Sequence, residues 1–483
     1  YDTVMNFRVV TVAQLLKAAG YRTYLTGKWH LGSDAKRLPH ARGYDRAYSL
    51  ADAGADNFEQ RPIEGMYDTA AWTENGRPAT LPKDYYSSHF VVQKMIDYIE
   101  ADRTSGKPFL ASINFLANHI PVQAPDSDIA RYAAMYKEGW TALREARAKR
   151  AAALGIMPQG APMVTMATTP DWATQDAEER AAAIRVMQAY GGMATAMDRE
   201  IGRLVAHLKA TGDYENTIFV FLSDNGPEPT DPFNRTINRL FLNSKYDTST
   251  ANIGRRGSFS AIGPGWASAS ASPLSGYKFT ASEGGLRVPL IIAWPGHAQI
   301  RAGTINDGFA HVTDILPTLL DLAGVTGQQG RWEGRPVESI VGRSLVPMLA
   351  GAEGSVHGDT PLGYELSGNA ALFRGDYKLV RNLAPTGDGM WRLFNLKADP
   401  GETNDLSAAM PNRFAAMRAD YANYAKANGV LEMPAGYTAD EQINRYAFER
   451  QGKPRLIRLA TWAGGIIVLL AALLWWRRRR RRV

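Results

Sequence analysis

The sequence GYRTYLTGKWHLG at residues 20–32 holds a short apolar run that leads to a lysine and a histidine. It follows a helical pattern over residues 11–19, which Thr11 is placed to cap and the first glycine of the segment to end. Residues two apart in an extended segment point to the same side, so Lys28 and His30 would enter one pocket together. A fixed cation beside an imidazole that titrates near neutral pH suits the cleavage of an anionic ester, although an ordinary surface loop is the alternative for this segment alone.

Helical and strand-like patterns alternate along the rest of the chain, which predicts an α/β domain with a largely parallel sheet. A Ser/Ala/Gly-rich stretch at residues 254–273 interrupts the alternation and is predicted to be a long loop beside the pocket. From about residue 361 to residue 406 the runs become short and are joined by glycine and aspartate turns, which predicts a small antiparallel subdomain. Apart from these, strands are expected at residues 108–115, 217–222 and 288–294, and helices at residues 182–211 and 313–323.

Composition excludes several classes of function. The chain has 483 residues and no cysteine, so disulfides, thiolate metal sites and a cysteine nucleophile are excluded within it. Its formal net charge is +7, but six arginines lie together at Arg477–Arg482 and the remainder is nearly neutral. A nucleic-acid-binding face requires basic residues clustered over a folded surface, and the sequence predicts none.

The sequence SDNG, which includes Asp224 and Asn225, directly follows the predicted strand at residues 217–222. Carboxylate and amide oxygens at the carboxyl end of a strand are hard donors suited to Ca²⁺ or Mg²⁺. Gly226 is expected to let the backbone turn sharply so that both side chains converge. The competing interpretation is an Asx turn that simply ends the strand.

Two further residues lie beside predicted strands. His119, in the sequence NHIP, follows the strand at residues 108–115, and Lys278 precedes the strand at residues 288–294. Alone, such a histidine or lysine is usually structural. Together with the Lys-x-His segment and the Asp-Asn pair, they predict one anion-binding pocket at an edge of the sheet. The other six histidines show no partner pattern and are interpreted as structural or solvated, with His311 placed to cap or pack.

In order, the chain contains GYRTYLTGKWHLG, NHIP, SDNG, K-x-x-x-x-E-G-G-L-R-V-P and TDILPTLLDLAG. This series resembles the sulfatase family, and within it the bacterial arylsulfatase and alkylsulfatase branch of the alkaline-phosphatase superfamily. The similarity runs from Thr11 to about Leu406 and includes the late motif FNLKADPGETNDLS. It implies an α/β/α sandwich with a mostly parallel central sheet and a small C-terminal antiparallel subdomain.

The resemblance also implies roles for individual residues. Asp224 and Asn225 match two ligands of the family's Ca²⁺, for which Mg²⁺ is a possible substitute. Lys28 and Lys278 match the lysines that hold sulfate oxygens, and Lys278 is also placed to assist the leaving oxygen. His119 matches the sulfate-binding imidazole near the leaving group. Fixed cations and a metal stabilise the charge that builds on the oxygens during sulfate transfer.

The family's nucleophile is the hydrated aldehyde of formylglycine, made from Cys or Ser in a C/S-x-P-x-R motif. His30 matches the residue that contacts its hydroxyl and helps to release sulfate. In the family, that motif and two further metal-binding aspartates precede GKWHLG, and this chain, which begins at Tyr1, lacks them. We therefore expect an N-terminally truncated chain that is inactive alone. The complete protein would need a formylglycine-generating or equivalent maturation enzyme.

Two other functions stay open at this point. A phosphodiester or phosphonate monoester hydrolase of the same superfamily would share the pocket chemistry, although the Asp224-Asn225 pair favours calcium and sulfate. A membrane-anchored, non-catalytic binder of sulfated ligands is the other alternative. The expected substrate is a small-molecule sulfate ester, and the residues present do not discriminate among aryl, alkyl, sterol and glycan sulfates.

Residues 459–476 form an uncharged run of 18 residues with tryptophans near both ends, followed by the six arginines. As a helix this run would span roughly 27 Å, enough for the hydrocarbon core of a bilayer, whereas a buried core helix is the alternative. The arginines place the tail in the cytoplasm and the body in the periplasm or outside the cell. The predicted organisation is a catalytic domain at 1–358, an antiparallel subdomain at 359–440, a linker at 441–458, the membrane helix, and a tail at 477–483.

Overall fold

The sequence at residues 20–32 forms the end of a helix–strand unit, as predicted. In the computed structural model, which describes residues 4–298 and 300–480, helix α1 (Val12–Ala18) is followed by strand β1 (Arg22–Lys28). The Thr11 hydroxyl accepts a hydrogen bond from the Gln14 amide at 3.1 Å and so caps α1. All residues of β1 between its two ends are buried, so this strand lies inside the molecule.

The main sheet is mixed rather than largely parallel. Strand β1 is flanked by two parallel neighbours, β2 (Arg46–Leu50) and β5 (Phe109–Asn114). Beyond β2 the sheet continues through the antiparallel strands β3 (Trp72–Glu74) and β4 (Arg77–Pro78), which gives the order β4-β3-β2-β1-β5. The parallel part is therefore the part that carries Lys28 at its carboxyl end.

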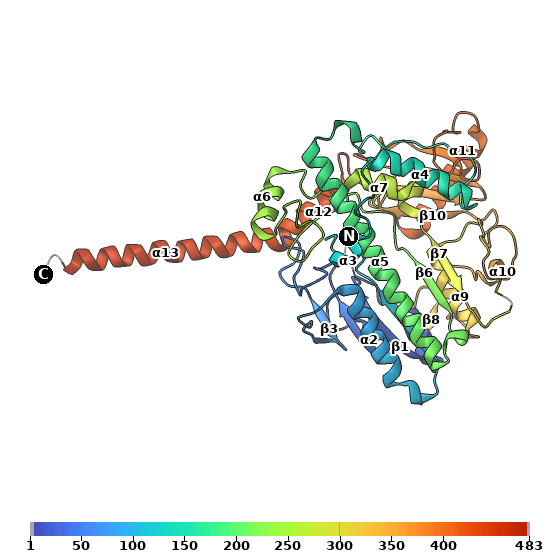
Figure 1. Ribbon diagram of the computed structural model, residues 1–483, viewed down its shortest axis with the longest axis horizontal. Coiled ribbons are helices and arrows are strands. Elements are labelled where there is room, and N and C mark those ends of the chain that lie inside the picture. Colours follow the sequence, from blue (N-terminus) through green and yellow to red (C-terminus); the bar gives the residue numbers. More distant parts are fainter. Residues whose placement is uncertain (1–3, 299, 481–483) are drawn as a thin grey trace.

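Helices α2 (Ser87–Ala101) and α5 (Ala177–Thr211) pack against each other, and α2 also contacts β1 and β5 (Figure 1). The core beneath them is apolar and includes Met95 of α2. Helix α5 begins five residues earlier than predicted, because the Asp176 carboxylate accepts a hydrogen bond from the Glu179 amide at 2.8 Å and starts the helix there.

A second, separate pair of strands holds the Asp-Asn motif. Strand β6 (Phe219–Leu222) pairs with β7 (Leu290–Ala293), and the two run antiparallel. The prediction of parallel pairing is wrong for these two strands. The segment between them contains long loops and the helices α6 (Thr236–Lys245), α7 (Gly263–Ala271) and α8 (Glu283–Leu286). It brings β7 alongside β6 in the opposite direction. The far edges of β5 and β6 have no partner strand among the described residues, and Phe221 of β6 is exposed.

The C-terminal part forms a four-stranded antiparallel sheet, in the order β10-β11-β12-β13. This agrees with the antiparallel strands predicted for residues 361–406. Helix α11 (Pro411–Asn428) packs on this sheet and buries Met417 and Tyr421 against it. The four strands of this sheet are β10 (Leu362–Leu366), β11 (Asn369–Arg374), β12 (Tyr377–Arg381) and β13 (Arg392–Asn395). The boundaries of the domains predicted from the sequence stay predictions.

The Ser/Ala/Gly-rich stretch at residues 254–273 is not one long loop, as predicted, but contains the buried helix α7 (Gly263–Ala271). Trp266 of α7 is only 1% exposed. A Cβ at Gly265 would come within 2.6 Å of the Trp140 ring, so the small residue permits this close packing. Small residues here serve helix packing rather than flexibility.

The predicted apolar segment lies in helix α13 (Lys453–Arg480), which projects from the globular body as a single long rod (Figure 1). Its part from Lys453 to Arg477 is long and apolar enough to cross a membrane, and an 18-residue window within it has a mean hydropathy of 2.1 and no residue buried in the body. Arg481 and Arg482 of the predicted tail lie outside the described residues. The remaining helices include α3 (Asp126–Ala130), α4 (Gly139–Ala153), α6 (Thr236–Lys245), α8 (Glu283–Leu286), α9 (Ile315–Leu322), α10 (Val346–Leu349) and α12 (Ala439–Ala447).

Candidate active site

Lys28 is the last residue of β1, and two features hold this strand end in place. The Asn114 side-chain amide donates a hydrogen bond to the Lys28 carbonyl oxygen at 2.8 Å. Gly27 has φ +99°, and a Cβ there would come within 2.0 Å of the Asn114 carbonyl oxygen, so only glycine fits between the strands. His30 follows with φ +48°, a conformation unusual for a residue with a side chain.

The charges around Lys28 and His30 come from distant parts of the chain. Burial lowers the pKa of Lys28, and the nearby Lys278 lowers it further, whereas Asp224 and Glu228 oppose this shift. Burial together with the positive charges of Lys28 and Lys278 lowers the pKa of His30 to about 4. His30 is therefore neutral at pH 7, which differs from the proton donor near neutral pH that the sequence suggested.

Lys278, His119 and Glu228 form the tightest cluster of the site. The Lys278 Nζ lies 2.7 Å from Glu228 Oε2 and 3.3 Å from His119 Nε2. His119 Nε2 is also 4.0 Å from Glu228 Oε2. All three side chains are largely buried, at 16%, 23% and 9% exposure for the lysine, the histidine and the glutamate. The cluster is thus a desolvated cation held between a carboxylate and an imidazole.

The contacts of His119 determine its tautomer. Its Nδ1 lies 2.8 Å from the Ile120 carbonyl oxygen, which can only accept, so Nδ1 carries the proton. Its Nε2 then accepts a hydrogen bond from the Lys278 ammonium. Burial, followed by the charges of Lys278 and Lys28, lowers the pKa of His119 to about 4. The imidazole is neutral at pH 7 and acts here as an acceptor.

Glu228 is a site residue that the sequence analysis missed. Burial would raise its pKa, but the charge and hydrogen bond of Lys278 and the hydroxyl of Thr230 lower it overall, so Glu228 is ionised. The signal was present, because Glu228 lies only three residues after Asn225 in the sequence SDNGPEP. A glutamate after a strand is common, however, and only its burial beside Lys278 distinguishes this one.

Backbone hydrogen bonds join the Asp-Asn loop to the Lys278 loop. The Lys278 amide donates to the Pro227 carbonyl oxygen at 3.0 Å, and the Gly226 amide donates to the Gly285 carbonyl oxygen at 2.9 Å. A Cβ at Gly226 would lie 1.9 Å from the Gly284 carbonyl oxygen. Gly226 is therefore required for close approach of the two loops. The predicted sharp turn is not its main role.

Asp224 and Asn225 lie just after the carboxyl end of β6, as predicted. Asp224 is exposed and Asn225 half-buried, and the Asp224 charge acts on Lys28 and His30. Their oxygens have the chemistry that Ca²⁺ prefers, but Ca²⁺ takes about six to eight ligands. Among the described residues no group of three or more His, Cys, Asp or Glu side chains is placed to hold a metal ion. The pair therefore fits part of such a site, and further donors would have to complete it.

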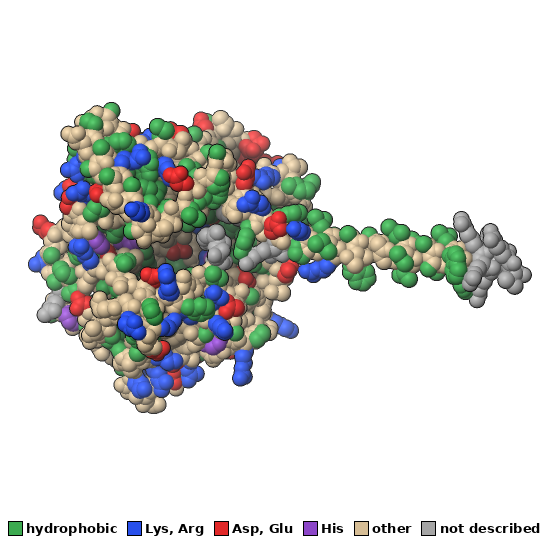
Figure 2. Space-filling model, turned by 180° about the vertical axis from the view of Figure 1, so that it is seen from behind, with side chains coloured by type: hydrophobic (Ala, Val, Ile, Leu, Met, Phe, Trp, Pro, Cys, Tyr) green, Lys and Arg blue, Asp and Glu red, His purple; other side chains and the backbone are tan. Residues whose placement is uncertain are grey.

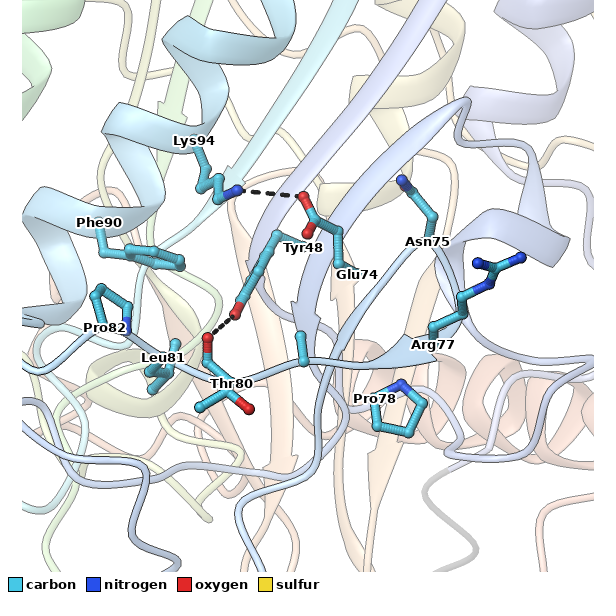
Figure 3. A pocket seen from close by; sticks show the side chains of 11 residues that line it. Tyr48, Glu74, Asn75, Arg77, Pro78, Thr80, Leu81, Pro82, Phe90 and Lys94 are labelled. Atoms are coloured by element: carbon cyan, nitrogen blue, oxygen red, sulfur yellow. Dashed lines mark hydrogen bonds and ion pairs between the residues drawn. The ribbon is translucent and has the colours of Figure 1, made fainter.

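A surface pocket of about 830 Å³ lies elsewhere, between β2, β3, β4 and α2 (Figure 3). Its polar groups bind one another: Lys94 Nζ lies 3.2 Å from Glu74 Oε1, and the Tyr48 hydroxyl donates to the Thr80 carbonyl oxygen at 3.1 Å. None of the six predicted site residues lines it. His311 also lies outside the cluster and caps the start of a helix, as interpreted from the sequence.

Comparisons with known proteins give a consistent result. The Sulfatase family pattern matches residues 6–325 of this chain. An uncharacterized sulfatase of Schizosaccharomyces pombe is 32% identical over 459 residues, which cover 91% of this chain and 81% of that protein. An arylsulfatase of Klebsiella aerogenes is 34% identical over 355 residues, which cover 72% of this chain and 73% of that protein. The crystal structure of Ps i-CgsB is similar in fold, with a TM-score of 0.61, 20% identity, and coverage of 95% of this chain and 82% of that chain.

Proposed function

Because this chain belongs to the sulfatase family, we propose that it hydrolyses sulfate monoesters at the cluster formed by Lys28, His119 and Lys278. The observation that carries this proposal is the buried Lys278 ammonium held between Glu228 and His119, with Lys28 close enough for its charge to lower the pKa of His30. Sulfate transfer spreads negative charge over several oxygens, and desolvated cations stabilise that charge more strongly than exposed ones.

Lys278 has three N–H donors, and two of them point to Glu228 and His119. The third is left for a sulfate oxygen or for the leaving oxygen of the ester. Glu228 acts as a positioning residue, since its carboxylate holds the ammonium without touching the substrate. The neutral His119 contributes an uncharged acceptor that keeps the lysine oriented. Lys28 supplies the second cation from the end of β1.

Asp224 and Asn225 would hold a Ca²⁺ ion, with Mg²⁺ as a substitute, together with donors from outside the described residues. Bound there, the ion would draw charge from the sulfate oxygens, and formylglycine would supply the nucleophilic oxygen. The exposure of Asp224 supports this assignment, because an exposed carboxylate is accessible to a ligand.

We place the nucleophile in a segment outside these 483 residues. The chain contains no C/S-x-P-x-R sequence. Among the described residues β5 and β6 each have an edge without a partner strand, and Phe221, Leu222 and Ile291 are exposed on the β6–β7 pair, which supports a further strand in this region. His30 would face that segment and help to release sulfate from it. On this proposal, the polypeptide of residues 1–483 is inactive without the added segment.

The helix at Lys453–Arg477 supports a single-pass anchor. In that arrangement the lipid bilayer is a partner, the catalytic body lies in the periplasm or outside the cell, and the arginine tail is cytoplasmic. Such a location suits the scavenging of sulfate esters before uptake, and millimolar external calcium would fill even a weak site.

The test compares 4-nitrophenyl sulfate with 4-nitrophenyl phosphate and a phosphonate monoester as substrates of the protein that includes its upstream segment. We expect the sulfate ester to have the highest kcat/KM and chelation of divalent cations to reduce it. Preference for a phosphate or phosphonate ester would contradict the proposal. Binding of the sulfate ester without turnover, in protein shown by mass spectrometry to carry formylglycine, would indicate a non-catalytic binder.

A further inference from the structure

Helix α6 presents an apolar ridge to the outside of the molecule. Ile237 and Leu240 are 72% and 62% exposed, and their spacing of three residues places them on the same face of the helix. Leu242 lies on the other side, where it is buried with Ile63, Tyr246 and Phe259. The helix is therefore fixed to the body by its inner face and keeps two large aliphatic side chains in solvent.

The charges of α6 are of one sign. Its ten residues, TINRLFLNSK, include Arg239 and Lys245 and no acidic residue, and Arg235 precedes it. All three basic residues are exposed. Apolar side chains flanked by arginine and lysine on a surface helix are typical of helices that lie in the headgroup region of a membrane.

The same loop that supports α6 also contacts the start of α13. Ile63 packs beneath α6, and the Arg61 guanidinium donates to the Lys245 carbonyl oxygen at 2.5 Å. A few residues further on, Asp68 forms an ion pair with Arg455 of α13 at 2.6 Å. In Figure 1, α6 lies on the side of the body from which α13 projects. Hydrophobic and basic side chains are both visible where the body meets the rod in Figure 2.

We propose that α6 is a second membrane contact, in which Ile237 and Leu240 enter the headgroup region of the same bilayer that α13 crosses. Arg235, Arg239 and Lys245 would then lie at the level of lipid phosphates, so an anionic bilayer is the partner that fits. This inference rests on the membrane anchor proposed above. Two contacts fix the orientation of the body on the membrane, whereas a single helix leaves it free to tilt.

The absence of cysteine from the chain allows a direct test by site-specific labelling. Single variants Ile237→Cys and Leu240→Cys are labelled with a fluorophore, as are Val341→Cys and Leu469→Cys. Val341 is a matched control that is 78% exposed on the body, and Leu469 reports on the anchor. The full chain is reconstituted in vesicles of equal parts phosphatidylcholine and phosphatidylglycerol that contain lipids with a nitroxide quencher near the headgroup or deep in the acyl chain.

We expect shallow quencher to reduce the fluorescence at positions 237 and 240, deep quencher to reduce it at 469, and neither to affect 341. Quenching at 237 and 240 should weaken when phosphatidylglycerol is left out, because the basic residues then lose their anionic partners. If 469 is quenched while 237 and 240 behave like 341, the inference is wrong and the anchor stands. If 469 is not quenched, the anchor itself is wrong and the inference falls with it.

Discussion

At the scale of single residues, the site depends on how one ammonium group is held. The Lys278 Nζ lies 2.7 Å from Glu228 Oε2 and 3.3 Å from His119 Nε2, which leaves one of its three N–H donors without a hydrogen-bond acceptor among the described residues. Replacing Lys278 with Ala removes that donor and the cation together. We expect kcat toward a sulfate ester to fall by about 10²–10³-fold with a much smaller change in KM, since the interaction strengthens as charge develops. Steady-state kinetics check this, and near-normal kcat would remove Lys278 from the mechanism.

Glu228 lies 2.7 Å from the Lys278 ammonium, and on the proposed mechanism it orients Lys278 without contacting the substrate, so its replacement should act through the lysine. We expect Glu228→Gln to lower kcat while KM changes little, and Glu228→Asp to restore part of the loss. Glu74→Gln is a suitable control, because Glu74 also pairs with a lysine, Lys94, but outside the site. Equal kinetics for Glu228→Gln and Glu74→Gln would show that the Glu228 contact has no role in turnover.

The lowered pKa of His119 predicts a pH dependence of stability. Its pKa is about 4 in the folded protein against an ordinary value of 6.5, so between these values the unfolded chain binds the proton more readily. The free energy of unfolding should therefore be fully maintained above about pH 6.5 and decrease as the pH falls toward 4. Denaturant titrations of wild type and His119→Gln across this range test the prediction, with His40→Gln as an exposed control. An unchanged pH slope in His119→Gln would contradict it.

At the scale of elements, a buried ion cluster joins the C-terminal sheet to the loop that carries Lys278. Lys378 of β12 is fully buried and lies 2.8 Å from both Glu283 of α8 and Glu402. Burial opposes the charge of Lys378, but the two carboxylates raise its pKa overall, and burial raises the pKa of Glu402. The Glu283 amide also donates to Glu402 Oε2 at 2.9 Å. The cluster therefore holds the C-terminal sheet against the segment that follows Lys278.

Replacing Lys378 with Met would leave two carboxylates buried without a counter-charge. We expect a loss of about 3–5 kcal/mol in the free energy of unfolding, as for other buried pairs that lose one partner. Arg392→Met provides the control in the neighbouring strand, since Arg392 and Asp388 form an exposed pair and its loss should cost less than about 1 kcal/mol. Chemical denaturation of both variants gives the comparison, and equal losses would refute the special role of the buried cluster.

At the scale of the whole molecule, the body and α13 are distinct in surface chemistry. The apolar window of α13 makes no buried contact with the body, so removing it should leave the fold intact. We expect deletion from Leu459 onward to release active enzyme into the soluble envelope fraction, when the upstream segment is present. Fractionation and activity assays test this. A deleted form that stays with the membrane would show that α13 is not the main anchor.

Features determined by near neighbours could be predicted from the sequence. The Thr11 cap depends on Gln14 three residues away, and the apolar run at residues 459–476 needs no partner to be helical. The motifs around Lys28, His119, Lys278 and Asp224 predict one pocket because strand ends in α/β sheets gather ligands, and their assignment to one binding site stays a prediction.

Features determined by distant contacts needed the tertiary structure. Strand direction is not encoded in the four residues of β6, whose pairing with β7 depends on the path of the long segment between them. Glu228 is an ordinary surface residue by sequence and becomes a site residue only because Lys278, 50 positions later, lies 2.7 Å away in a buried environment. Burial, together with the charges of Lys28 and Lys278, lowers the pKa of His30 and of His119 and so makes both neutral. Residue types and short spacings are local properties of a chain, whereas pKa, burial and strand pairing depend on which remote segments pack together.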